Sequence, residues 1–280
     1  MLKPTQLLFG TAGIPNSTPN RNTINGIKHV NKLGLDSMEL QFNRSINVNE
    51  TLAPEVKQTA KQNNVILTCH GSYFVNLNSQ EKEKIEASKK RIIDAARRCH
   101  ECGVWSLTFH PAYYMKQTPE KVYKKVHEGF KDILKILKNE GITLWIRPEI
   151  GGKQSQFGDL RELIKLSQEF EQVLPCIDWA HLHARTGGQY NTQKEFEQVL
   201  EQIEKHLGKN ALQQMHCHCE GVEYSPTGEK NHVNLEQSDM KFKDLIKVWK
   251  TFKIKGVITS ESLNIEEDAL LMQKLYNKCT

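Results

Sequence analysis

Histidine and acidic residues recur in this 280-residue chain where short apolar runs end. Seven of the eleven histidines lie at or just beyond such a run. They are His70, His110, His181, His183, His216, His218 and His232, and the carboxylates in comparable places are Glu39, Glu149, Asp178 and Glu261. Histidine together with carboxylate is the ligand set that proteins offer to zinc or manganese. The pattern therefore predicts a metal site, provided that the fold brings the ends of these runs together.

One of these runs, residues 215–219, reads MHCHC. Because side chains alternate between the two faces of a strand, the two histidines should point one way and the two cysteines the other. We expect His216 and His218 to face inward, and Cys217 and Cys219 to pack outward as small apolar side chains. The spacing of these cysteines does not suit a zinc knuckle, and an odd total of seven cysteines does not suit a disulfide framework.

The runs belong to a unit that recurs along the chain, an amphipathic stretch that ends in glycine and is followed at once by an apolar run. Two examples are ARRCHECG before VWSLTFH and WKTFKIKG before VITSES. A glycine just past the last turn is a typical helix cap, and short apolar runs are typical of buried parallel strands. The predicted strands lie near residues 6–11, 36–42, 65–70, 104–110, 142–149, 173–179, 213–219 and 256–261.

Eight alternations of strand and helix favour a single (β/α)₈ TIM barrel, with one catalytic domain over residues 1–280. A doubly wound sheet is the alternative. Active sites of TIM barrels lie at the C-terminal ends of the strands, which is where the histidines and carboxylates fall. Their number exceeds the three or four protein ligands of one zinc ion, so two or three ions can share the site if one carboxylate bridges. Such metal clusters suit in-line displacement at phosphorus.

The composition bounds the other properties of the chain. Its hydrophobic fraction is 38%, its formal net charge is +5, and no apolar run approaches the roughly 18 residues that span a bilayer. The N-terminal stretch MLKPTQLLFG lacks the apolar segment of a secretion signal. We therefore expect a monomeric cytoplasmic protein without membrane contact. The net charge is compatible with a polyanionic partner but does not by itself indicate one.

Several motifs, taken in their order and placement, give the chain a family resemblance. They include FGTAGIP at 9–15, CHGSYFVNL at 69–77, PEIGGK at 148–153, CIDWAHLHA at 176–184 and MHCHCEG at 215–221. Over nearly its whole length the chain resembles the endonuclease IV family of apurinic/apyrimidinic (AP) endonucleases, in particular the shorter archaeal-type members. The resemblance implies Zn²⁺-dependent cleavage of double-stranded DNA 5′ to abasic sites, leaving a 3′-hydroxyl and a 5′-deoxyribose phosphate. Mn²⁺ is the alternative cofactor.

The resemblance also implies a role for individual side chains at three metal positions. The implied ligands are His70 and His110 at the first metal, Asp178, His216 and Glu261 at the second, and His181 and His232 at the third. Glu149 bridges the first two metals in this scheme and is the catalytic residue.

The chain departs from the family pattern in the loop after the seventh predicted strand. Lys230 stands two residues before His232, where better-known members have an aspartate, and an ammonium group cannot bind a metal. The residues that can complete the third site in its place are Glu229, His183 and His218. We favour His218, because it shares an inward face with His216. The alternative is a third position that is empty or weakly filled, with Lys230 holding the phosphate in its place.

Three residues are candidates for DNA contact. Tyr73 stands where the family presents a side chain to the opened DNA, although a loop aromatic packing on Phe74 is an equal alternative. Arg44 and Lys230 are candidates for phosphate contact, with an ordinary solvated charge as the alternative for Arg44.

Two other functions compete with DNA cleavage. A sugar isomerase or epimerase on the same barrel needs a single metal, and its plausible ligands are Glu149, Asp178, His216 and Glu261. His70 and His110 argue against it, because two further ligands imply a second metal. A non-enzymatic DNA-binding protein is the third class, and it would not need a full ligand set.

Overall fold

The computed structural model describes residues 2–279 and contains one sheet of eight parallel strands. The strands are β1 (Leu7–Ala12), β2 (Ser37–Gln41), β3 (Ile66–His70), β4 (Ser106–Phe109), β5 (Trp145–Pro148), β6 (Cys176–Asp178), β7 (Met215–His218) and β10 (Gly256–Ser260). Their order in the sheet is β5-β4-β3-β2-β1-β10-β7-β6. Parallel bridges from Ile146 to Val173 and from Glu149 to Cys176 join the two ends of the sheet next to β6. The sheet is therefore a nearly closed barrel, as the sequence predicted.

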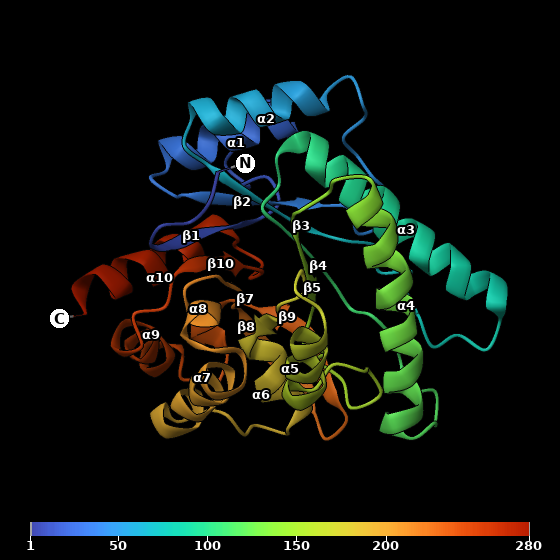
Figure 1. Cartoon of the computed structure of the whole chain (residues 1–280). Coiled ribbons are helices and arrows are strands. Elements are labelled where there is room, and N and C mark those ends of the chain that lie inside the picture. The colour runs from blue at the N-terminus through green and yellow to red at the C-terminus, as the bar shows by residue number, and fades with distance from the viewer. Residues whose placement is uncertain (1, 280) are drawn as a thin grey trace.

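Helices lie between the strands and surround the barrel (Figure 1). They are α1 (Thr23–Lys32), α2 (Ala53–Gln62), α3 (Lys82–Cys102), α4 (Pro119–Asn139), α5 (Leu160–Glu169), α6 (Trp179–Arg185), α7 (Gln193–Leu207), α8 (Lys209–Leu212), α9 (Phe242–Thr251) and α10 (Glu266–Lys278). The predicted glycine cap is present after α3, where Gly103 has the left-handed φ of 72°. The second example was wrong, because α9 ends at Thr251 and Gly256 is the first residue of β10. No helix within residues 2–279 is long and apolar enough to span a membrane.

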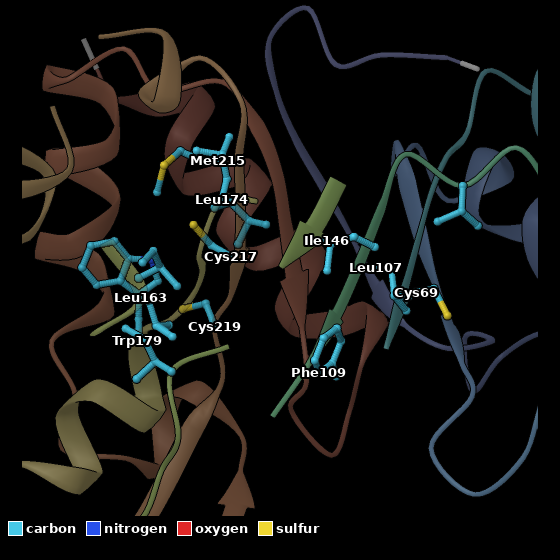
Figure 2. Close-up of a cluster of buried hydrophobic side chains, with 14 of the residues drawn as sticks. Cys69, Leu107, Phe109, Ile146, Leu163, Leu174, Trp179, Met215, Cys217 and Cys219 are labelled. Carbon is cyan, nitrogen blue, oxygen red and sulfur yellow. The ribbon is translucent and has the colours of Figure 1, made fainter. Parts of the chain in front are cut away.

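The hydrophobic core lies mainly between the barrel and its helices. Cys217 and Cys219 of the β7 region are fully buried there, in the same cluster as Leu163 and Trp179 (Figure 2). The predicted alternation of the MHCHC run is therefore confirmed on its cysteine side. Arg147 of β5 is buried, and its guanidinium lies 5.0 Å from the centroid of the Trp105 ring.

A β-hairpin that the sequence did not predict follows β7. It consists of β8 (Gly221–Ser225) and β9 (Gly228–Val233), and it forms a separate antiparallel sheet. Glu223 pairs with Asn231, but the next pair is Tyr224 with Glu229, so Lys230 is skipped. Lys230 is thus the extra residue of a β-bulge, and the alternation of side chains shifts by one residue at this point.

Candidate metal centre

The first group of ligands comes from three neighbouring strands. His70 is the last residue of β3, His110 follows β4, and Glu149 follows β5. The Nε2 atoms of His70 and His110 lie 3.2 and 3.6 Å from the two carboxylate oxygens of Glu149. His70 Nδ1 is 2.8 Å from the Gly71 carbonyl oxygen, so it donates its proton there and leaves Nε2 free to bind a metal.

The second group shares Glu149 and adds residues from three other strands. Its members are Glu149, Asp178, His218 and Glu261, and their ligand atoms all lie within 4.8 Å of one another. His218 Nδ1 is 3.2 Å from Glu149 Oε1 and 3.7 Å from Glu261 Oε1. One carboxylate, that of Glu149, is therefore close to histidine nitrogens of both groups. This is the arrangement of a bridging ligand.

The structure does not bring His216 into the second group, where the sequence-based scheme had it. His216 points inward as expected, but it pairs with Cys176 in the sheet, whereas His218 pairs with Asp178. Two residues along a strand correspond to about 6.6 Å, so His216 lies deeper in the barrel than the ligands. Its Nδ1 is 3.0 Å from Ser106 Oγ instead. The geometry therefore places His218, and not His216, in this group.

The carboxylate of Glu39 contacts both His216 and His218. Its Oε2 atom is 3.2 Å from His218 Nε2, 3.1 Å from His216 Nε2, and accepts a hydrogen bond of 3.1 Å from Thr68. Burial opposes the charge of Glu39, but the neighbouring His218 and His216 outweigh it and keep the pKa of this carboxyl below its usual value. Glu39 therefore fixes the ring of His218 so that Nδ1 faces the centre.

The third group joins α6 to the hairpin. Asp178 caps α6 by accepting a 2.7 Å hydrogen bond from the His181 backbone N–H, which places His181 over the centre. His181 Nε2 and His232 Nε2 each lie 3.5 Å from an oxygen of Glu229. The bulge at Lys230 explains why Glu229 reaches the group, because it puts residues 229 and 232 on one face of β9. Lys230 itself is exposed.

Glu229 is thus the residue that completes the third group, and His218, which we had favoured, belongs to the second. His183, the other candidate, is fully buried but lies elsewhere. Its Nε2 is 3.0 Å from Asp239 Oδ1, and its Nδ1 is 2.8 Å from the Gln189 carbonyl oxygen.

Charges within the centre perturb its titration strongly. Burial raises the pKa of Glu149, but the neighbouring His110, His218 and His70 lower it by more, so the pKa is well below its usual value. For His70, burial lowers the pKa, yet the Glu149 carboxylate outweighs it and raises the value to about 9. The same balance with Asp178 raises the pKa of His181 to about 10. In His110 burial prevails, and its pKa falls to about 4. Glu149 is therefore ionised, and protons on His70 and His181 neutralise part of the negative charge of the centre.

The donor set fits divalent cations. Asp178 Oδ2 is buried and has no hydrogen-bond donor within residues 2–279. His181 Nδ1 lies 3.0 Å from it, but that nitrogen is also 3.0 Å from the Ile150 carbonyl oxygen, to which its proton is directed. A buried carboxylate oxygen without a donor is costly unless another positive group compensates. Imidazole and carboxylate at these distances are suitable ligands for zinc or manganese.

Exposed apolar side chains gather at the rim of the same barrel end. Within residues 2–279, six of the seven large hydrophobic side chains that are exposed lie on loops that follow strands β2, β3, β4 and β10. They are Ile46, Tyr73, Phe74, Tyr113, Met115 and Leu263. Tyr73 is 54% exposed, its ring is 5.2 Å from that of His70, and its hydroxyl accepts a 2.8 Å hydrogen bond from Asn43. Arg44 is also exposed on this rim.

A sequence model of the xylose isomerase-like TIM barrel family matches residues 27–275, which is most of the chain. The chain belongs to the xylose isomerase-like TIM barrel family. An uncharacterized protein of Methanocaldococcus jannaschii is 37% identical over 278 residues, which cover 99% of this chain and 100% of that protein. An endonuclease 4 homolog of Dictyostelium discoideum is 28% identical over 165 residues, which cover 57% of this chain and 30% of that protein.

Solved structures of xylose isomerase-like barrels are similar over nearly the whole chain. Endonuclease IV from Thermus thermophilus has a TM-score of 0.72 at 18% identity, covering 97% of each chain. A D-tagatose 3-epimerase-like protein has a TM-score of 0.74 at 15% identity, covering 97% of this chain and 96% of that one. Because both an endonuclease and an epimerase-like protein share the fold, the xylose isomerase-like barrel alone does not distinguish hydrolysis from epimerisation.

Proposed function

We propose that this protein is a metal-dependent DNA repair endonuclease that cleaves the phosphodiester 5′ to abasic sites and leaves a 3′-hydroxyl and a 5′-deoxyribose phosphate. The observation that carries the proposal is the presence of three adjacent ligand groups, of which two share Glu149. An epimerase needs one metal, and one group would serve it. Three groups in one barrel mouth match the needs of a phosphodiester, which has an attacked phosphorus and a leaving oxygen to stabilise.

The proposed cofactor is Zn²⁺, with Mn²⁺ as the alternative. When bound, such ions would polarise the phosphate and activate water for the attack. The chain contributes the positioning. Glu149 holds the first two positions together, Glu39 fixes the ring of His218, and the Asp178 cap fixes His181. In this proposal Glu149 is the catalytic residue, because it would touch both ions that contact the reacting phosphate.

The proposed partner is double-stranded DNA with an abasic site. An abasic nucleotide has no base to unstack, so it turns out of the duplex at lower cost than a normal one. Tyr73 and the other rim side chains offer apolar surface to the bases exposed by that opening. Arg44, Lys153 and Lys230 are exposed near the mouth and are suited to phosphate contact. Arg185 is not, because it donates to the carbonyl oxygens of Gly151 and Gly158.

Sugar epimerisation is the second candidate. The similarity to a D-tagatose 3-epimerase-like structure supports it, as does the second ligand group, which by itself can hold one metal. It leaves His70, His110 and the third group without a role. It also leaves unexplained why apolar side chains gather at the rim.

Incision of a labelled duplex with one tetrahydrofuran abasic analogue tests the proposal. We expect cleavage 5′ to the analogue, abolished by chelator and restored by Zn²⁺ or Mn²⁺, with a 3′ end that a DNA polymerase extends. Two buried histidines offer matched variants: H218Q should lose incision, whereas H183Q should retain it. A metal-loaded protein that leaves this duplex intact but epimerises a ketohexose would refute the proposal.

A further inference from the structure

A buried acidic residue next to the centre has no role in the scheme above. Glu220 lies two residues after the end of β7 and is 0% exposed. Neither of its carboxylate oxygens has a hydrogen-bond partner within residues 2–279. Buried carboxylates are normally paired, because removal from water costs several kcal/mol that only a counter-charge or hydrogen bonds offset. Either a bound proton or a nearby positive group must therefore offset the burial of this carboxylate.

The surroundings of Glu220 narrow down that group. No Lys or Arg nitrogen of residues 2–279 forms an ion pair with Glu220, whereas His232 Nε2 lies 4.0 Å from Glu220 Oε1. Ligand atoms of Asp178, His181 and Glu220 lie within 4.8 Å of one another. Two histidines of the third ligand group thus adjoin this carboxylate, and no lysine or arginine does.

The direction of the side chain follows from the local sequence. His218 faces the barrel mouth and Cys219 faces the core, so the alternation that continues from β7 turns Glu220 back toward the mouth. It approaches the third group from the side of the barrel strands. Glu229, in contrast, approaches from the hairpin.

We propose that Glu220 is a fourth protein ligand of the third cation, together with His181, Glu229 and His232. The proposal rests on the multinuclear centre and not on the identity of the substrate. Two carboxylates balance the charge of a divalent ion, and two histidines with two carboxylates supply the four ligands that a closed zinc site requires. The third ion would then be held by one more protein ligand than His181, Glu229 and His232 provide alone.

Metal content without DNA tests the role of Glu220. After loading with Zn²⁺ and gel filtration, elemental analysis should give three equivalents in the wild type and two in E220Q. E266Q is the matched control, because Glu266 is also buried but accepts hydrogen bonds from the backbone N–H groups of Asn16 and Ser17. It should retain three equivalents. Competition with a chromogenic chelator should show the weakest site of E220Q reduced by about tenfold or more, since even an indirect partner of a ligand is worth that much.

Other outcomes overturn the inference. Three equivalents in E220Q, with an affinity within about twofold of the wild type, would exclude direct ligation. If E220Q does not fold by circular dichroism, E220D decides. Retention of three ions at wild-type affinity by E220D, whose carboxylate is displaced, would assign Glu220 to folding rather than to the metal. A wild type that holds only two ions refutes the third position altogether. A wild type that holds three but leaves abasic DNA intact refutes the substrate and leaves the ligand role of Glu220 standing.

Discussion

Replacement of Glu39 by glutamine should weaken metal binding at the second position, although Glu39 itself binds no metal in our scheme. Its Oε2 atom accepts from His218 Nε2 at 3.2 Å, and this contact leaves His218 Nδ1 directed at the centre. A glutamine keeps the shape and one acceptor oxygen. It removes the negative charge that makes the bonded imidazole a better ligand.

The size of the effect follows from these contacts. Loss of a hydrogen-bond partner behind a metal-binding histidine typically costs about 10- to 100-fold in metal affinity. In E39Q the amide oxygen can still accept from His218, and a neutral acceptor is roughly half as strong as a charged one. We therefore expect the lower end, about tenfold, which is about 1.4 kcal/mol of binding free energy. E39A, which leaves the N–H groups of two buried histidines unpaired, should approach the upper end.

Chelator competition on the wild type, E39Q, H218Q and the double variant provides the assay. If Glu39 acts through His218, the double variant should lose no more affinity than H218Q alone. T68V is the control, because it removes one neutral donor to the same oxygen and keeps the charge; it should stay within about twofold of the wild type. Additive losses in the double variant, or wild-type affinity in E39Q, would refute the reasoning.

Four further predictions concern the metal centre and the proposed DNA substrate. E149Q should retain the fold but lose incision by roughly a thousandfold, the scale of a lost electrostatic stabiliser, and a variant within about tenfold of wild type contradicts the bridging role. Deletion of Lys230 should preserve all three metal equivalents. It removes the bulge but leaves Glu229 two residues before His232 on a regular strand, so both side chains stay on one face. A drop to two equivalents would argue against the bulge. Metal affinity should rise with pH from about 6 to 9, because His70 and His181, with pKa values of about 9 and 10, must release protons to bind a metal. Calorimetry in buffers of different ionisation enthalpy measures this proton release. Absence of proton release would count against these two ligands. Affinity for abasic duplex should fall with salt with a log–log slope of several units, and a flat response points to an uncharged substrate.

The barrel could be predicted from the sequence because its signals are local. Each predicted strand overlaps an observed one, since a short apolar run, preceded in some cases by a glycine cap such as Gly103, marks the strand without reference to the rest of the chain. The inward direction of His216 and His218 follows from alternation in the same way. Which of them reaches the mouth depends on the register of β7 against β6, and register is set by distant packing that a local pattern does not contain.

The third ligand group depends on the β-bulge at Lys230, which the spacing of residues in the sequence does not indicate. In a regular strand, residues 229 and 232 lie on opposite faces, so their spacing alone does not favour Glu229 as a partner of His232. The bulge at Lys230 reverses that relation. The hairpin signal was available, since GVEYS and GEKNHV are short runs separated by a proline-containing turn. A bulge position within such a hairpin depends on how the loop meets its neighbours, here Gly152 and Lys153.

Because the hairpin carries two of its proposed ligands, the third position should exchange its ion independently of the other two. Glu229 and His232 lie on a two-stranded sheet outside the barrel, joined to the loop after β5 by the 2.9 Å hydrogen bond from Glu229 N to Gly152 O and by the Lys153–Gly228 bridge. A two-stranded sheet outside the barrel opens more often than the core of a fold. We therefore expect an ion bound at the proposed third position to leave through local opening of β8 and β9 while the barrel stays closed. Amide hydrogen exchange in this hairpin should then be slow when the ion is bound and fast when it has left, so the exchange rate would report how long the ion stays.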